Sequence, residues 1–285
     1  MLAFDVRMDI AAAIRGLTEL ERKQVPFALA RGLTQTARDI HGGLAEAMPA
    51  VFDRPTRWTT GAYFVKPATK KDLVATVMSR QFAGKGTPAA AMLRHHIEGG
   101  TRKPKMFESR LQAVGIMDSG TFGTMGRDVA EKDAYGNIPA AKYVSMLSAL
   151  KAHTDSRAYM NRTGKFGKGK RGKEIYFIGG RGRAKHLAPG IYQHFGYFGK
   201  AIKPTYMFVS KAPAYRARFP FAAISERISR GRLVVNFLTA LDAAFKTARG
   251  GPIRSPYVGH MKAQAESAST DPRSLARGVL SDLER

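Results

Sequence analysis

The stretch most suggestive of chemistry is a run of glycines and basic residues at 164–171, with the sequence GKFGKGKR. It matches G-x-x-x-x-G-K, the pattern of loops whose backbone N–H groups cradle phosphates, and residues 167–172 also match G-x-G-x-x-G. However, Arg171 stands where the first pattern needs a serine or threonine to reach magnesium. Both patterns also require a strand before and a helix after the loop, whereas here we expect a strand to follow. We therefore interpret the run as a cationic loop that contacts phosphate backbone or an acidic partner, or is simply solvated.

A second candidate, for a metal site, is His95-His96-x-Glu98. Adjacent helical residues point about 100° apart, and no third ligand lies at a defined spacing. We interpret this segment as a helix end that Gly99-Gly100 closes. The chain has no cysteine, which excludes disulfides, thiolate chemistry and cysteine–zinc sites.

General acid–base catalysis needs two carboxyl groups, or an equivalent pair, placed around a substrate. Asp53 and Glu98 are the acids most closely tied to the expected architecture, but no second carboxylate is placed beside either of them. We therefore predict no catalytic residue, no metal and no cofactor, and we do not expect an enzyme.

Aromatic residues form two further candidates. Phe195, Tyr197 and Phe198 lie between glycines near Lys200, where they could stack on nucleic-acid bases or form a subunit interface. The single tryptophan, Trp58, is expected to pack against the base of the preceding long helix rather than to anchor a partner.

The elements that must position these residues begin with a helix at 5–22 and a longer one from Pro26 to about residue 52. Pro26 suits the first helical position because its missing N–H would have no partner there, and apolar residues at steps of three and four follow. The chain breaks near Gln24-Val25 and turns at 53–56. We then expect strands at 63–68 and 73–79.

Later segments are predicted from the same patterns. Residues 116–137 lack periodicity and are interpreted as a long surface excursion. The helices that we expect lie at 89–97, 104–114, 139–150 and 219–248, and the strands at 174–178, 190–195 and 206–210.

Together these elements predict an α+β protein, in which an N-terminal helix pair and a long C-terminal helix pack on an antiparallel sheet with long basic loops. We expect one domain over 1–248, with an insertion of loops and helices at about 81–173. An extended arm over 249–285 should follow, and its last residues, 273–283, can form a short helix.

Charge is the most informative part of the composition. The chain has 47 Lys and Arg against 22 Asp and Glu, which gives a net charge of +25. Such an excess is typical of a protein beside a polyanion, which can be nucleic acid, an acidic protein surface or anionic lipid. The alternative is a basic surface without a dedicated ligand. With 44% hydrophobic residues the chain can bury a core, and no apolar run predicts a membrane span.

Several short segments match a family pattern. They are Thr34, Thr36–Asp39, Val51–Thr56, Trp58–Gly61, Val65–Thr69, His95–Gly100 and Lys203–Tyr215. In this order they make the chain resemble the tail-completion (neck) proteins of tailed bacteriophages, of the minor tail protein Z type. The resemblance covers most of residues 1–245, and its motifs are architectural.

The resemblance implies a structural virion protein that completes or joins the tail at the head–tail interface as part of a homo-oligomeric ring, a hexamer in the family. Its partners would be further copies, head-connector and tail proteins and transiting DNA, in a virion assembled in the host cytoplasm. Because the resemblance implies a ring, it favours the subunit-interface interpretation of Phe195, Tyr197 and Phe198. The alternative is a basic nucleic-acid-binding protein. We assign the contact with DNA or an acidic partner to loop residues Lys165, Lys168, Lys170, Arg171, Lys173, Arg181 and Arg183.

Overall fold

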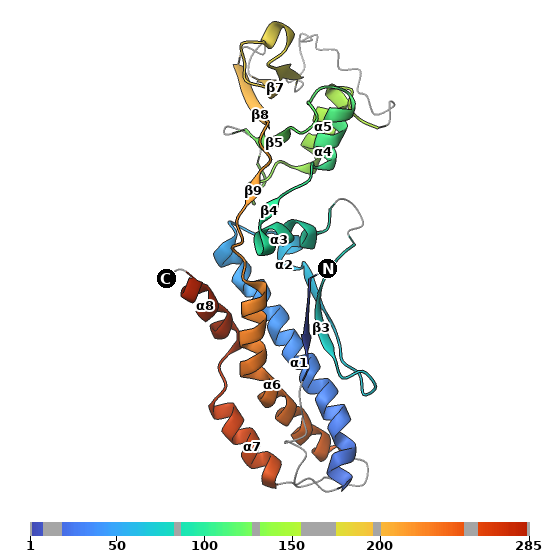
Figure 1. The fold of residues 1–285 in the computed structure, drawn as a ribbon, viewed down its shortest axis with the longest axis vertical. Helices are drawn as coiled ribbons and strands as arrows, with labels where there is room; N and C mark the ends of the chain where they lie inside the picture. The colour runs from blue at the N-terminus through green and yellow to red at the C-terminus, as the bar shows by residue number, and fades with distance from the viewer. Residues whose placement is uncertain are drawn as a thin grey trace. The chain divides into compact units, whose positions relative to one another are not determined.

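The structure is a computed structural model that describes residues 2–7, 19–82, 87–126, 132–154, 175–195, 201–247 and 256–283. Its contacts divide the chain into two compact units, which differ in extent from the predicted domain and its insertion. Unit 1 comprises Met1–Gly99 and Arg216–Arg285, and unit 2 comprises Gly100–Tyr215. Helices and antiparallel sheets occur in both units (Figure 1), which confirms the predicted α+β class.

Unit 1 is built around two long helices, α1 (Glu19–Val51) and α6 (Phe221–Lys246), which lie side by side (Figure 1). Glycine allows the two backbones to approach closely, because a Cβ added at Gly32 would lie 2.7 Å from the Cα of Phe237. The apolar residues of α1 recur at steps of three and four and share one buried face, as predicted. The core residues of the two helices include Leu29, Leu33, Ile40, Leu44, Met48, Ile224, Ile228, Leu238, Leu241 and Phe245.

Helix α1 begins earlier than we predicted. The expected break at Gln24-Val25 is absent from the described residues, because the helix runs continuously from Glu19 and contains Pro26 in its interior. An interior proline removes one helical hydrogen bond. Burial of Val25 and Ala28 on either side of it offsets that loss.

A three-stranded antiparallel sheet in the order β1-β3-β2 completes the core of unit 1. Strand β1 (Ala3–Val6) overlaps the start of the helix predicted at 5–22, because these residues pair with β3 (Ala75–Ser79). Residues 8–18 of that predicted helix lie outside the described residues. The strands predicted at 63–68 and 73–79 are confirmed in shorter form. The remaining elements of this region are β2 (Tyr63–Lys66), α2 (Arg57–Thr60) and α3 (Ala89–Glu98).

The C-terminal segment is largely helical where we expected an extended arm, and its last helix agrees with the short helix expected at 273–283. It contains two helices, α7 (Pro256–Ser267) and α8 (Pro272–Leu283), and α8 contacts both α1 and α6. Val258, Ala276 and Val279 are buried in the core of unit 1. These few apolar residues, spaced for a helix, are enough to fold the segment onto its neighbours although most of its residues are small and polar.

Unit 2 combines two short helices with a four-stranded antiparallel sheet in the order β5-β8-β7-β6. Strand β5 and the buried Met117 lie within the segment that we predicted to be a surface excursion, so this part of the prediction was wrong. The elements of the unit are β4 (Gly100–Thr101), α4 (Met106–Ala113), β5 (Phe122–Met125), α5 (Ala140–Ala149), β6 (Ile175–Gly179), the 3-10 turn η2 (Gly182–Ala184), β7 (Gly190–Phe195), β8 (Ala201–Val209) and β9 (Ala214–Tyr215).

Candidate functional site

The predicted basic contact residues fall in two parts of the chain. Lys165, Lys168, Lys170, Arg171 and Lys173 lie outside the described residues. Arg181 and Arg183 lie in the turn between β6 and β7, as expected.

Arg181 already has partners within unit 2. Its guanidinium donates to the backbone oxygen of Gly115 and, at 2.8 Å, to the carboxylate of Asp118. Part of its charge is therefore neutralised by the loop after α4, whereas Arg183 is exposed. The two arginines are thus not equivalent as contact residues.

The predicted interface aromatics are only partly described. Phe195 is the last residue of β7, where its backbone pairs with Ala201 of β8. Tyr197 and Phe198 lie outside the described residues. Their assignment to an interface stays a prediction.

Trp58 is not packed away as we expected, since 47% of it is exposed. It lies in the single turn of α2, which Thr56 caps by accepting a hydrogen bond from the N–H of Thr59 at 3.2 Å. A helix this short cannot cover so large a side chain. Trp58 therefore remains available to a partner.

The histidine pair has structural contacts. The Nδ1 atom of His96 accepts a hydrogen bond from Arg218 at 3.2 Å, and its ring meets the ring of Phe52 edge-on. Glu98 pairs with Arg94 one helical turn away. Across the described ranges of the chain, no three His, Cys, Asp or Glu residues are grouped so that they could hold a metal ion.

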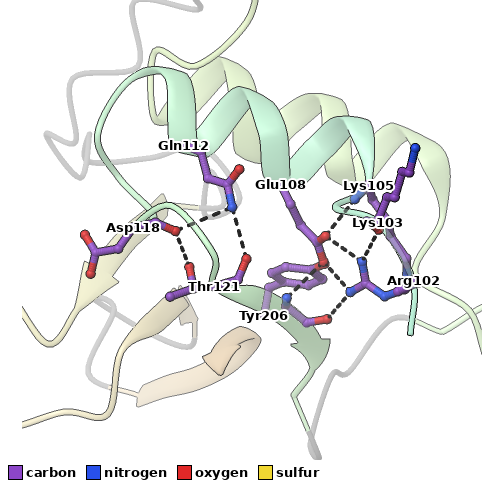
Figure 2. A network of polar contacts seen from close by, with 9 residues as sticks. Arg102, Lys103, Lys105, Glu108, Gln112, Asp118, Thr121 and Tyr206 are labelled. Atoms are coloured by element: carbon purple, nitrogen blue, oxygen red, sulfur yellow. Dashed lines mark hydrogen bonds and ion pairs between the residues drawn. The ribbon is translucent and has the colours of Figure 1, made fainter. Parts of the chain in front are cut away.

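A buried carboxylate, Glu108, accepts more hydrogen bonds than any other side chain among the described residues of unit 2 (Figure 2). Arg102 donates to both of its oxygens, at 2.6 and 2.5 Å. The N–H groups of Lys105 and Gly123 donate at 2.7 and 2.9 Å, and the hydroxyl of Tyr206 donates at 2.7 Å. We call these five residues the Glu108 cluster.

The cluster is suited to bracing rather than to proton transfer. Burial alone would raise the pKa of Glu108, but hydrogen bonds led by those of Arg102 outweigh it and lower the pKa to about 2. Burial and the bond to this carboxylate raise the pKa of Tyr206 above its usual range. Glu108 therefore stays ionised and fully occupied, and it ties α4 to β5 and β8.

Sequence reasoning missed this cluster and singled out Asp53 and Glu98, both of which form surface ion pairs. A signal was present, because Glu108 occupies the third position of α4, where an acid typically accepts the N–H of the capping residue. Gly123 was a weaker signal. A Cβ at this position would lie 1.8 Å from the ring of Tyr206, so only glycine lets that ring cross β5.

A second candidate site is a groove of about 650 Å³ in unit 1, which we call the α1–α6 groove. Arg31 and Arg38 of α1 and Lys70 of the β2–β3 loop line it, together with Phe27. Thr34 positions the loop beside α1, since its hydroxyl accepts the N–H of Ala68 at 3.1 Å. The floor is largely apolar and includes the small residues Ala30, Ala68, Ala240 and Ala243.

The groove is strongly cationic. No acidic side chain is among the described residues that line it. None of the ion pairs between described residues involves Arg31, Arg38 or Lys70. The Arg31 guanidinium lies 5.8 Å and the Lys70 ammonium 5.1 Å from the centre of the Phe27 ring. Two of the three cations therefore make cation–π contacts with the same ring.

Asp39 follows Arg38 in sequence but is occupied elsewhere. Its carboxylate accepts hydrogen bonds from Arg232 at 3.2 Å, Asn236 at 2.8 Å and Gln35 at 3.0 Å. The bonds from Arg232 and Asn236 fix α1 against α6, so Asp39 is already paired. The groove cations therefore keep their charge unneutralised.

The sequence patterns did not bring Arg31 and Arg38 together with Lys70. The signal was the spacing of seven residues between the two arginines, which aligns them on one side of a helix. The contribution of the β2–β3 loop was not readable, because it depends on tertiary packing.

Comparisons of the chain with protein-family models, with curated proteins and with solved structures found no match. None of the described helices is long and apolar enough to span a membrane.

Proposed function

We propose that this protein is a structural component of a tailed-phage virion that completes or joins the tail at the head–tail interface. It would act as one subunit of a homo-oligomeric ring, a hexamer if the resemblance extends that far. Head-connector and tail proteins would be its other partners, and assembly would take place in the host cytoplasm. The mechanism is association rather than chemistry.

The observation that carries this proposal is the cationic α1–α6 groove. Arg31, Arg38 and Lys70 are exposed, and none of them has an ion pair among the described residues. Unneutralised cations around a groove favour binding of a negatively charged surface. By contrast Glu108, the most strongly held acid of the described residues, has its oxygens filled by protein donors. The assignment to a virion comes from the resemblance to tail-completion proteins.

The second candidate function is nucleic-acid binding. The net charge of +25 favours it, because each phosphate contact adds affinity through release of counterions. Such a protein would bind duplex DNA as a monomer, and its affinity would fall steeply with salt.

Measuring the mass of the purified full chain in solution, alone and with a short DNA duplex, separates the two functions. The measurement is made at low and at moderate salt. A closed oligomer whose mass is a whole-number multiple of the chain supports the proposal, and negative-stain images should then show rings. A monomer that binds the duplex with a steep dependence on salt would overturn it in favour of the nucleic-acid binder.

A further inference from the structure

We infer that the α1–α6 groove is a docking site for an acidic amphipathic helix of another protein. This inference rests on the proposed function and names the chemistry of one partner. It uses the groove's three cations, its apolar floor and the spacing of its arginines.

The floor of the groove argues for a protein partner. Phe27, Ala30, Ala240 and Ala243 offer apolar surface between the two helices, and the alanines leave room for a side chain to enter. Burial of such surface is favourable only if the ligand brings apolar groups of its own. A phosphodiester backbone brings none, whereas an amphipathic helix brings a stripe of them.

The rim of the groove specifies the charge of that helix. Arg31 and Arg38 are seven residues apart on α1, which corresponds to a rise of about 10.5 Å. Glutamates placed every seventh residue on a second helix have the same spacing, so a helix lying along α1 can meet both arginines. Lys70 adds a third cation from the loop.

Two of the three cations are held in place before any partner arrives. Arg31 and Lys70 lie over the Phe27 ring, and Thr34 holds the loop that carries Lys70 through its bond to Ala68. Preorganisation of this kind reduces the conformational entropy lost on binding. The groove is thus formed in the free protein.

The probe is a labelled synthetic helix of about 20 residues, long enough to be helical in water, with glutamate at every seventh position and alanine and leucine on the same face. Its binding to the full chain is followed by fluorescence anisotropy. A matched peptide with glutamine in place of glutamate, and a short DNA duplex, serve as the other ligands.

Two double variants test the cations. R38Q/K70Q removes two charges from the groove, and R57Q/K71Q removes two exposed charges of the same unit that do not line it. Exposed pairs contribute up to about 1 kcal/mol each, so the first variant should weaken acidic-peptide binding about tenfold and the second less than about twofold.

A third variant tests the floor without changing the charge. Ala243 is half-buried in the groove, and A243L would fill the space that the peptide's apolar side chains need. We expect acidic-peptide binding to weaken about fivefold, because roughly one buried apolar group is displaced. Its DNA binding should be unchanged.

Three results would overturn the inference. They are failure of the wild-type chain to bind the acidic peptide, equal losses in the two double variants, and binding of the duplex that is lost in R38Q/K70Q and competes with the peptide. The mass measurement is made on the same samples. If the wild-type chain forms a ring but fails to bind the peptide, the docking site alone is rejected. If the wild-type chain is a monomer that binds the duplex with a steep dependence on salt, the proposed function is rejected as well.

Discussion

The Glu108 cluster of unit 2 and the α1–α6 groove of unit 1 both contain arginine, but they hold it in opposite ways. In the cluster, the Arg102 side chain is 9% exposed and faces a carboxylate that is fully buried. In the groove, Arg31 and Arg38 are exposed and have no ion pair within the described parts of the chain. The same side chain therefore serves the fold in one place and remains free for a partner in the other.

This contrast shows that the basic residues behind the large net charge fall into two groups, those paired within the protein and those without a partner. An arginine whose charge is matched inside the protein contributes to stability and little to the external field. An arginine without a partner contributes little to stability and attracts ligands. Variants of the two sites should therefore separate stability from binding, and the predictions below run from the largest expected effect to the smallest.

Replacing Glu108 by glutamine should produce the largest effect. E108Q leaves the buried Arg102 charge unmatched, and breaking a buried pair in this way costs about 3–5 kcal/mol. Hydrogen exchange of peptides from residues 100–215 would report the loss in unit 2, while fluorescence of Trp58 would report unit 1. E98Q is the matched control, since its exposed pair with Arg94 should be worth less than about 0.5 kcal/mol. Equal losses of stability in E108Q and E98Q would contradict the contrast between the paired arginine of the cluster and the exposed arginines of the groove.

Acid should weaken unit 2 through the same residue. The pKa of Glu108 is about 2 in the folded chain and 4.5 ordinarily, so its contribution is complete above pH 4.5 and is lost as pH falls towards 2. The difference between the two pKa values corresponds to about 3 kcal/mol in the free energy of unfolding. Exchange of unit 2 measured from pH 5 to pH 2 should show this loss in the wild type. The same titration of E108Q should be flatter, and an identical slope would refute the assignment.

Substitution of Gly123 by alanine should have an intermediate effect. The new Cβ would lie 1.8 Å from the Tyr206 ring, so the ring must move away from Glu108. Forcing atoms into a packed site costs about 1–3 kcal/mol. G42A provides a control of opposite sign, because no atom lies within 4 Å of that Cβ and alanine favours a helix by about 1 kcal/mol. Thermal unfolding monitored by circular dichroism would compare the two.

The groove variant R38Q/K70Q should have the smallest effect on stability. Both side chains are exposed, and surface substitutions of this kind change the free energy of unfolding by less than about 0.5 kcal/mol. Urea unfolding followed through Trp58 would measure it. A loss as large as that of E108Q would mean that the groove cations support the fold, and it would remove the contrast between the two sites.

The sequence predicted the regular parts of the fold well. The buried face of α1 and the strands β2 and β3 followed from local spacing, because helix and strand periods are properties of the chain itself. The extent of α1 across Pro26, the helix α7 and the packing of the C-terminal segment on α1 and α6 did not, although a helix was expected at the position of α8. They depend on packing against distant elements, which a local pattern does not record.

The candidate sites were harder to predict than the fold. Glu108 meets Arg102 nearby in sequence, but its bond to Tyr206 joins residues 98 positions apart. The groove likewise needs α6 and the β2–β3 loop beside α1. The density of basic residues pointed to the Gly-Lys run at 164–171 as the contact site. The sequence does not reveal which basic residues are already paired with acids in the fold, so the groove was not found.

The interruption of unit 1 by unit 2 has a consequence for synthesis of the chain. Helix α1 ends at Val51 and its main partner, α6, begins at Phe221, so the ribosome must add about 170 residues between them. At about 5–20 residues per second this takes roughly 10–30 s. During that interval α6 is not yet available to pack on the apolar face of α1. Unit 2 is contiguous in sequence, so all of its residues are synthesised before those of α6. Nascent chains stopped between residues 51 and 221 should therefore be the forms that chaperones bind most strongly.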